Sequence, residues 1–438
     1  MSIADSLYNK IGFYDITENI VKPVVTPQNA IVAVHLALLS LGFHDPQIRL
    51  LIITFIYYIL YFSFIYTIYI IFSIFKVSAE ITILCIGVLL LSAYFLKIML
   101  LPVNDAIYCL SMALLFYAII TLDYTTKINA GKLLIVVGLS IIAVNSRLNG
   151  SLILLSACLS SLLVKNIRRA LLFLLLFCIC YCSVFLIAYL VNLDFQGIAR
   201  TKSHLFYKYS FYFFADKIIN TLTCTIPGLW GGWSGKRLYS LAPFSISIIV
   251  FYFLYFRQSV REKDFAKIFT ILTIAIDLFF FQAFSWYDSR YVIFILPLTL
   301  LAMATYFRND IILKRCLSII LLVTIASSIF RLAVWDRIIF GNYETKRAIK
   351  EKIAEPYLLM SQSPRDAYYI FQKRCDREAG NSRGIKTILL FGNKEYLSIK
   401  IDSIQQRYAI KAVEYFDKPI VYGHGDDYLF FIVRIVLN

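Results

Sequence analysis

The sequence predicts an all-α polytopic membrane protein with about ten transmembrane helices and a small C-terminal α/β domain. Hydrophobic residues make up 60% of the 438 positions and charged residues 16%, with a mean hydropathy of +0.74. Soluble domains are nearer half apolar and a quarter charged. The apolar residues also form long runs, such as the uncharged stretch between Arg49 and Lys76. A run of about 20 apolar residues is enough to cross the hydrocarbon core of a bilayer.

These apolar runs are predicted to be helices, because they lack the alternation of apolar and polar side chains that barrel strands show. Only helices and closed barrels satisfy every backbone polar group in lipid. We therefore expect transmembrane helices over residues 48–75, 78–101, 106–122, 132–146, 150–164, 170–192, 240–256, 267–284, 290–307 and 314–332.

Alternate connections between these spans are rich in lysine and arginine, which accounts for much of the net charge of +16. Short basic loops face the cytoplasm, so both termini are expected on the extracytoplasmic side, in a bacterial plasma membrane. No basic stripe with interleaved aromatics lies outside the spans, and nucleic acid is therefore not an expected partner. The orienting residues are Lys76, Lys127, Lys132, Lys165, Arg168, Arg169, Arg257, Arg261, Lys263, Lys267, Arg308, Lys314 and Arg315.

Three parts of the chain are expected. Residues 1–46 form an extracytoplasmic segment without an apolar core in its first 28 residues, so we expect neither a signal peptide nor a leading span there. The stretch TPQNAIVAVHLALLSLG at 26–42 is predicted to be a helix at the membrane interface. Residues 47–333 hold the spans. Residues 334–438 form the soluble α/β domain, with amphipathic helices over 346–375 and strands in IKTILLFGN, KPIVYG and YLFFIVRIVLN.

Two polar residues stand at the extracytoplasmic ends of predicted spans. Asp105 precedes the third span, where it either caps a helix or contributes to a site. Arg147, in NSRLNG, lies between two short apolar runs. It either extends its head group to the interface or binds an anion such as a phosphate.

Further candidates lie in the other extracytoplasmic segments. Arg290 and Tyr291 open the ninth span, in a context that also suits an interfacial belt of aromatic residues. The long segment 193–239 carries a basic cluster that suits anionic headgroups, namely Arg200, Lys202, His204 and Lys208. Together, cations and carboxylates on one side of the membrane suit a reaction at a lipid-linked phosphate.

The order of these pieces resembles the GT-C superfamily of polytopic membrane glycosyltransferases, in the branch of protein O-mannosyltransferases and the aminoarabinose transferase of lipid A. The similar stretches cover about residues 1–305. They are ADSLYNKIG at 4–12, TPQNAIVAVHLALLSLG at 26–42, DPQIRLLIITFIYYILY at 45–61, PVNDAIYCLSMALLFYAI at 102–119, LIVVGLSIIAVNSRLNG at 134–150 and SRYVIFILPLTLLA at 289–302.

The resemblance implies a polyprenyl-phosphate sugar donor and an inverting transfer to a glycan, lipid or protein acceptor on the extracytoplasmic side. It implies Asp5 as the general base and Asp105 as a second acidic residue. It also implies Arg147, Arg290, Tyr291, Arg200, Lys202 and Lys208 as residues that hold the donor phosphate. The chain departs from the family in lacking the usual first span. It also has Ala4 before Asp5 where the family often has two acids, which makes Asp15 or Glu18 the fallback base.

Two other classes of membrane protein are also compatible with the sequence. An O-antigen polymerase or ligase would depend on the segment 193–239 and would be indifferent to Asp5 and Asp105. A transporter or flippase would show paired broken helices and ionisable residues at mid-bilayer. No cofactor is implied with certainty. A divalent metal stays open, although the sequence has no cluster of carboxylates that would form a metal site.

Overall fold

A computed structural model describes residues 14–15, 22–23, 29–100, 105–122, 130–190, 242–282, 294–307, 311–329, 357–362, 386–416, 420–421 and 429–438. The chain divides into two compact units. One is a helical bundle within Val25–Ile329, and the other comprises Phe330–Asn438 with Met1–Val24. Each unit is described by itself.

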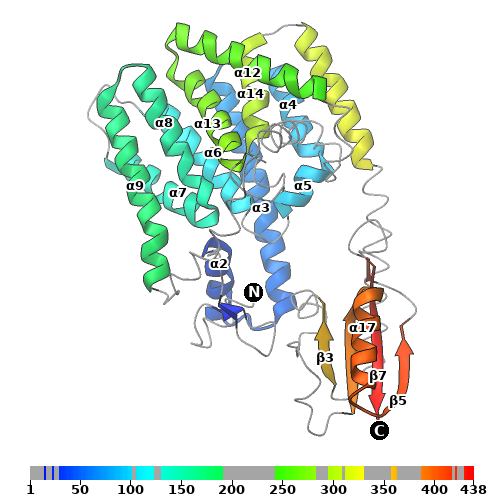
Figure 1. Ribbon diagram of the computed structural model, residues 1–438. Helices are drawn as coiled ribbons and strands as arrows, with labels where there is room; N and C mark the ends of the chain where they lie inside the picture. The colour runs from blue at the N-terminus through cyan, green and yellow to red at the C-terminus, as the bar shows by residue number, and fades with distance from the viewer. Residues whose placement is uncertain are drawn as a thin grey trace. The chain divides into compact units, whose positions relative to one another are not determined.

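The bundle consists of helices (Figure 1), and their bounds lie close to the apolar runs of the sequence. A short helix, α2 (Asn29–Ser40), lies within the stretch predicted to be interfacial. It is followed by α3 (Pro46–Ile74), α4 (Ala79–Leu91), α5 (Ala93–Leu100), α6 (Asp105–Thr121), α7 (Ala130–Ser146), α8 (Leu152–Leu163) and α9 (Ile167–Leu190). After the segment 191–241 come α12 (Ala242–Glu262), α13 (Phe265–Gln282), α14 (Ile295–Phe307) and a helix over Ile311–Ile329.

The outer surface of this bundle is apolar. Large side chains such as Leu51, Ile83, Leu134 and Leu322 are two-thirds or more exposed, an arrangement that would promote aggregation in water but suits lipid. Two helices, Leu51–Ile74 and Ile311–Ile329, are long and apolar enough to cross a membrane, and the other apolar helices found by the same criteria are shorter. The fold is therefore mostly helical, and the expected number of spans stays a prediction.

The predicted span 78–101 is not one continuous helix, because it breaks at Ser92 between α4 and α5. The polar groups at the break are satisfied by side chains from other helices. The Ser328 hydroxyl donates to the Leu91 carbonyl at 2.7 Å and accepts from the Ala93 amide at 2.9 Å. The Tyr61 hydroxyl lies 3.3 Å from the Leu89 carbonyl oxygen. Non-helical backbone in a bilayer requires such partners.

Three helices end on a lysine in the left-handed region, a conformation usually taken by glycine. These residues are Lys76 (φ 55°), Lys165 (φ 63°) and Lys263 (φ 51°). After each one, the next amide bonds back to a carbonyl five residues earlier, as in Val77 to Phe72 at 3.1 Å. A cation at the carboxyl end of a helix offsets part of the conformational cost by interacting with the helix dipole.

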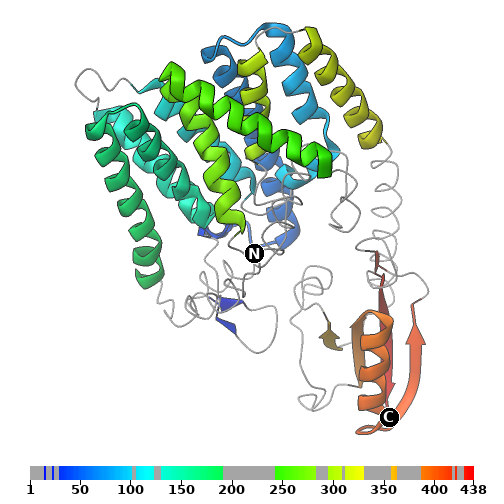
Figure 2. The ribbon, with the colours of Figure 1, turned by 45° about the horizontal axis from the view of Figure 1, so that its top comes forward.

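Helix α12 runs obliquely across its neighbours (Figure 2). Its Tyr255 hydroxyl bonds to the Thr305 hydroxyl of α14 at 2.9 Å. Helices α6 and α13 meet through the rings of Phe116 and Phe269, which stack with centroids 4.8 Å apart.

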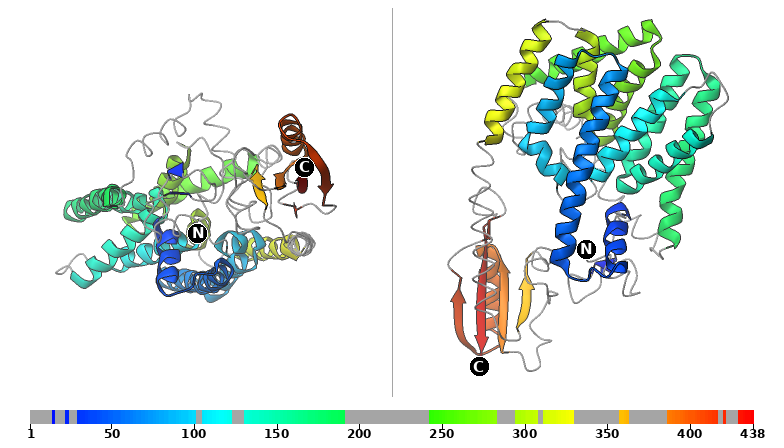
Figure 3. Two further views of the ribbon diagram at one scale, coloured as in Figure 1. Left: turned by 90° about the horizontal axis from the view of Figure 1, so that it is seen from below. Right: turned by 180° about the vertical axis from the view of Figure 1, so that it is seen from behind.

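The C-terminal unit contains a five-stranded sheet in the order β3-β4-β7-β5, with β6 also paired to β7. The strands are β3 (Leu358–Ser361), β4 (Thr387–Gly392), β5 (Ile410–Tyr415), β6 (Ile420–Val421) and β7 (Leu429–Leu437). Strands β3 and β4 run parallel, and the other pairs are antiparallel. Helix α17 (Lys394–Gln405) packs against β4 and β7, as Figure 3 shows from two further sides.

The prediction of amphipathic helices over 346–375 is wrong at β3, and the rest of that range lies outside the described residues apart from Tyr357 and Gln362. The Leu358–Met360 side chains are almost fully buried because β3 pairs with β4. A two-stranded ladder, β1 (Tyr14–Asp15) with β2 (Lys22–Pro23), belongs to the same unit.

Candidate functional site

Asp105 and Arg147, two of the candidates from the sequence, form an ion pair inside the bundle. Asp105 is the first residue of α6, where a carboxylate is favoured by the helix dipole. Its side chain is 2% exposed and that of Arg147 is 11% exposed. The second carboxylate oxygen, Oδ2, is buried without a hydrogen-bond partner among the described residues. Oδ2 of Asp105 can therefore accept a further hydrogen bond at a position that is shielded from water.

The turn between α7 and α8 positions Arg147. Arg147 follows the last residue of α7, and its amide bonds to the Ala143 carbonyl at 2.9 Å. The chain then makes a 3-10 turn over Leu148–Ser151, in which the Gly150 amide bonds to the Arg147 carbonyl at 2.8 Å. The guanidinium carbon lies 5.6 Å from the centre of the Tyr108 ring of α6. Backbone and ring together hold the cation against α6.

A third ionisable residue, Asp277 of α13, was not singled out from the sequence. It is 3% exposed. The signal that could have found it was a lone carboxylate inside the predicted span 267–284, since such residues are costly in lipid and usually functional.

Helix α2 contributes another buried polar group. His35 is 3% exposed, and its Nδ1 atom is buried without a hydrogen-bond partner among the described residues. Helix α2 packs on α7 and lies beside the Pro46 end of α3 (Figure 3). Burial lowers the pKa of His35 from 6.5 to about 3, and the positive charge of Arg49 acts in the same direction. His35 is therefore neutral at physiological pH.

This burial predicts an acid-sensitive contact. Between pH 6.5 and about 3 the unfolded chain binds a proton at His35 that the folded chain excludes. The stabilisation is complete above pH 6.5 and is lost as the pH falls, by about 2 kcal/mol at pH 5. Thermal unfolding of the detergent-solubilised chain at pH 7.5 and pH 5 measures this loss. In His35→Leu the difference in unfolding free energy between pH 7.5 and pH 5 should be smaller by that amount. An unchanged difference would contradict the assignment to His35.

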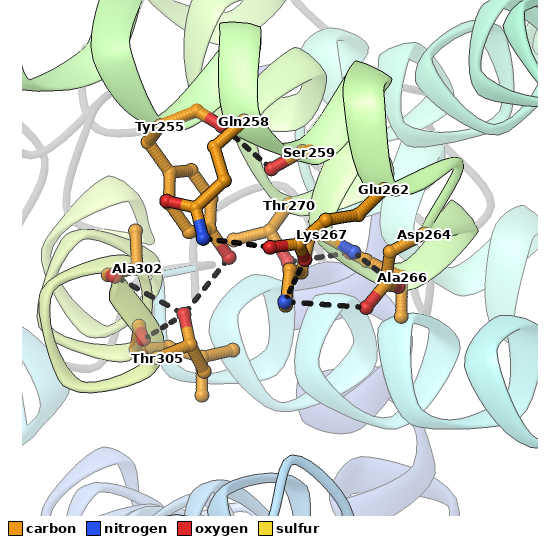
Figure 4. Close-up of polar contacts among 11 residues, drawn as sticks. Tyr255, Gln258, Ser259, Glu262, Asp264, Ala266, Lys267, Thr270, Ala302 and Thr305 are labelled. Atoms are coloured by element: carbon orange, nitrogen blue, oxygen red, sulfur yellow. Dashed lines mark hydrogen bonds and ion pairs between the residues drawn. The ribbon is translucent and has the colours of Figure 1, made fainter. Parts of the chain in front are cut away.

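A second polar cluster joins α12, α13 and α14 (Figure 4). It lies at the Phe265 end of α13, whereas Asp277 lies toward the Gln282 end. Lys267 forms ion pairs with Glu262 and, at 3.6 Å, with Asp264. Gln258 donates to Glu262 at 2.7 Å. The Arg169 guanidinium lies 3.2 Å from the Phe265 ring centre and so ties α9 to the same turn. Glu262 and Asp264 therefore share Lys267 as a basic partner, which indicates that this cluster stabilises the α12–α13 turn.

The other predicted site residues are distributed as follows. Asp15 lies in β1, opposite Lys22 in the register of the ladder. It belongs to the C-terminal unit by its contacts, whereas Asp105 and Arg147 belong to the bundle. The remaining candidates lie outside the described residues, namely Asp5, Arg200, Lys202, Lys208, Arg290 and Tyr291. Within the described ranges no group of three or more His, Cys, Asp or Glu side chains could hold a metal ion.

No family model matches the sequence, and no curated protein matches it either. Among solved structures, the chain matches the crystal structure of ArnT from Cupriavidus metallidurans bound to undecaprenyl phosphate. The match covers 99% of this chain and 92% of that chain with a TM-score of 0.60, at 9% sequence identity. The chain has a GT-C-like fold.

The resemblance to the aminoarabinose transferase branch is thereby confirmed at the level of the fold. In this GT-C-like fold, α6 and the α7–α8 turn bring together two residues that are 42 positions apart. The fold match includes both compact units, since nearly the whole chain is aligned.

Proposed function

We propose that this chain is an integral membrane glycosyltransferase that moves a sugar from a polyprenyl-phosphate donor to an acceptor on the extracytoplasmic side of a bacterial plasma membrane. The observation that carries the proposal is the fold likeness to ArnT over 99% of the chain, since ArnT was crystallised with undecaprenyl phosphate. The buried Asp105–Arg147 pair supports it, because it supplies a carboxylate and a cation at one end of the bundle.

The proposed reaction is a single displacement with inversion. The acceptor hydroxyl oxygen attacks the anomeric carbon while a carboxylate accepts its proton, and the bond from that carbon to the phosphate oxygen breaks. The polyprenyl phosphate leaves with the electron pair, and arginine or lysine side chains stabilise its charge. One carboxylate suffices, because no covalent sugar–enzyme intermediate is needed.

The general base is proposed to be Asp5, with Asp105 as a second acidic residue of the site. The ion pair supports this assignment, because Oδ1 of Asp105 already accepts a hydrogen bond from Arg147. Only Oδ2 lacks a partner among the described residues. A carboxylate bound to a guanidinium is a weaker base, so Asp105 is better suited to orient Arg147 and a substrate hydroxyl. Arg290, Tyr291, Arg200, Lys202 and Lys208 are proposed to hold the donor phosphate together with Arg147.

The test is sugar transfer in membranes that contain the full chain, using radiolabelled undecaprenyl-phosphate mannose and undecaprenyl-phosphate glucose. Removing a general base costs about 100-fold to 10,000-fold in rate, and we expect a loss in that range for Asp5→Asn. Asp105→Asn should also reduce transfer. Asp264→Asn, at the other end of α13, is the matched control and should keep full activity.

The outcomes separate the function classes. Equal transfer by wild type, Asp5→Asn and Asp105→Asn would remove the catalytic assignment. Loss on replacing Arg200 and Lys202, with indifference to Asp5 and Asp105, would favour a polymerase or ligase. Passage of lipid-linked sugar across proteoliposomes without any transfer would favour a flippase.

A further inference from the structure

We propose that the α8–α9 turn and the α12–α13 turn together bind the phosphate headgroup of an anionic phospholipid. The site consists of four exposed basic residues, Lys165 and Arg168 from the first turn and Arg261 and Lys263 from the second. This inference concerns the lipid that surrounds the bundle and does not rest on the proposed sugar transfer.

The two turns are built in the same way. In each, a lysine in the left-handed region ends the first helix, Lys165 with φ 63° and Lys263 with φ 51°. The next residue, Asn166 or Asp264, starts the second helix, and its side-chain Oδ1 accepts the amide three residues later at 3.1 or 3.2 Å. Each turn therefore carries one lysine at the same point between its two helices.

Arg169 shows that the two turns lie side by side. Its guanidinium carbon lies 3.2 Å from the centre of the Phe265 ring and 5.9 Å from the centre of the Phe173 ring. Arg169 belongs to the first turn of α9, and Phe265 is the first residue of α13. Helix α13 also packs against α8. The exposed cations of both turns therefore share one corner of the bundle.

This corner has an excess of positive charge. Residues 165–169 and 261–267 include six basic and two acidic residues. Both acids, Glu262 and Asp264, pair with Lys267, which is itself buried. Within the part of the chain that the structure describes, none of the four exposed cations takes part in an ion pair. Lysine and arginine side chains in such a setting bind phosphate groups.

Exposed apolar side chains beside these cations favour a phospholipid over a soluble anion. Leu163, Ile167 and Leu171 are 43%, 64% and 61% exposed. Leu163 lies two residues before Lys165, and Ile167 directly precedes Arg168. Basic side chains at the end of an apolar surface extend to the headgroup level of a bilayer. A phospholipid supplies acyl chains for the apolar side chains and a phosphate for the cations, whereas free phosphate supplies only the charge.

The experiment measures the binding of phosphatidylglycerol and of phosphatidylcholine to the purified full chain in detergent by native mass spectrometry. Glycine adopts the left-handed region without strain, so Lys165→Gly/Lys263→Gly removes two cations and leaves both turns intact. With about 5-fold in affinity for each cation near an anionic lipid, this variant should bind phosphatidylglycerol about 25-fold less tightly. Its affinity for phosphatidylcholine and its unfolding temperature should not fall.

Three further variants separate the site from the net charge and from the turn conformation. Lys165→Arg/Lys263→Arg keeps both cations and should keep the wild-type affinity. Arg168→Gln/Arg261→Gln lies in helical backbone and should repeat the loss of the glycine variant. Lys76→Gly is the matched control, because Lys76 has the same conformation, with φ 55°, at the α3–α4 turn. There Glu80 pairs with Lys314, so affinity should change by less than about 2-fold for this variant.

A wild type that binds both lipids equally would overturn the inference. So would a folded Lys165→Gly/Lys263→Gly variant that keeps the wild-type affinity for phosphatidylglycerol. An equal loss in Lys76→Gly would show that total charge, and not this corner, attracts the lipid, and would also overturn it. If the glycine variant did not fold, the Arg168→Gln/Arg261→Gln variant would decide in its place.

Discussion

Arg147→Met should destabilise the bundle by about 3–5 kcal/mol, because it leaves the Asp105 carboxylate buried without its counter-ion. Asp105→Leu should cost a similar amount for the opposite reason, since the guanidinium then remains buried alone. These are the largest effects that we expect from single changes of side-chain charge. Thermal and denaturant-induced unfolding of the detergent-solubilised full chain measures them.

The double variant Asp105→Leu/Arg147→Met separates stability from function. Replacing a buried ion pair by apolar side chains is often neutral or stabilising, so the double variant should recover most of the lost stability. Under the proposed function it should still transfer no sugar. Recovery of both stability and transfer would show that the pair is purely structural.

A more exposed pair provides the control for these measurements. Arg434 and Glu414 lie 3.6 Å apart on neighbouring strands of the C-terminal sheet, with side chains 23% and 55% exposed. Glu414→Gln should change stability by no more than about 1 kcal/mol, because exposed pairs contribute little. If Arg147→Met were equally mild, the Asp105–Arg147 pair would be accessible to water in the folded chain.

The sequence predicts the helices well, because lipid imposes a simple rule on them. A segment that satisfies its own backbone in an apolar environment does so most simply as a continuous apolar helix. For this reason the predicted ranges 48–75, 106–122 and 132–146 match α3, α6 and α7 within a few residues. The resemblance to the GT-C superfamily rests on the order of the same segments, and the structural match confirms it at the level of the fold.

Features that depend on distant partners were not predictable in this way. The break at Ser92 is stabilised by Ser328, more than 200 positions away in the sequence. The pairing of Asp105 with Arg147 has no local signal, since each residue reads separately as a cap or an interfacial cation. Strand β3 lies in a stretch with helical spacing, and its pairing with β4 overrides that local preference.

Gly150→Ala should destabilise the α7–α8 turn by about 3 kcal/mol or more, because a well-packed backbone cannot admit an added methyl group without shifting. A Cβ atom at Gly150 would lie 2.4 Å from both the carbonyl carbon and the carbonyl oxygen of Ala143. The Ala143 carbonyl also accepts the amide of Arg147, at 2.9 Å. The added methyl group would therefore displace the backbone that carries the arginine.

Gly138, in the middle of α7, is the matched control. A Cβ atom there would meet nothing within 4 Å, so Gly138→Ala should stabilise α7 by about 0.5–1 kcal/mol through its higher helix propensity. The same substitution is thus expected to lower stability at Gly150 and to raise it at Gly138. Unfolding midpoints of the two variants in detergent, measured beside wild type, give the comparison. If Gly150→Ala were as stable as Gly138→Ala, the backbone of this turn would have room that the close approach to Ala143 excludes, and Arg147 would not be held as described.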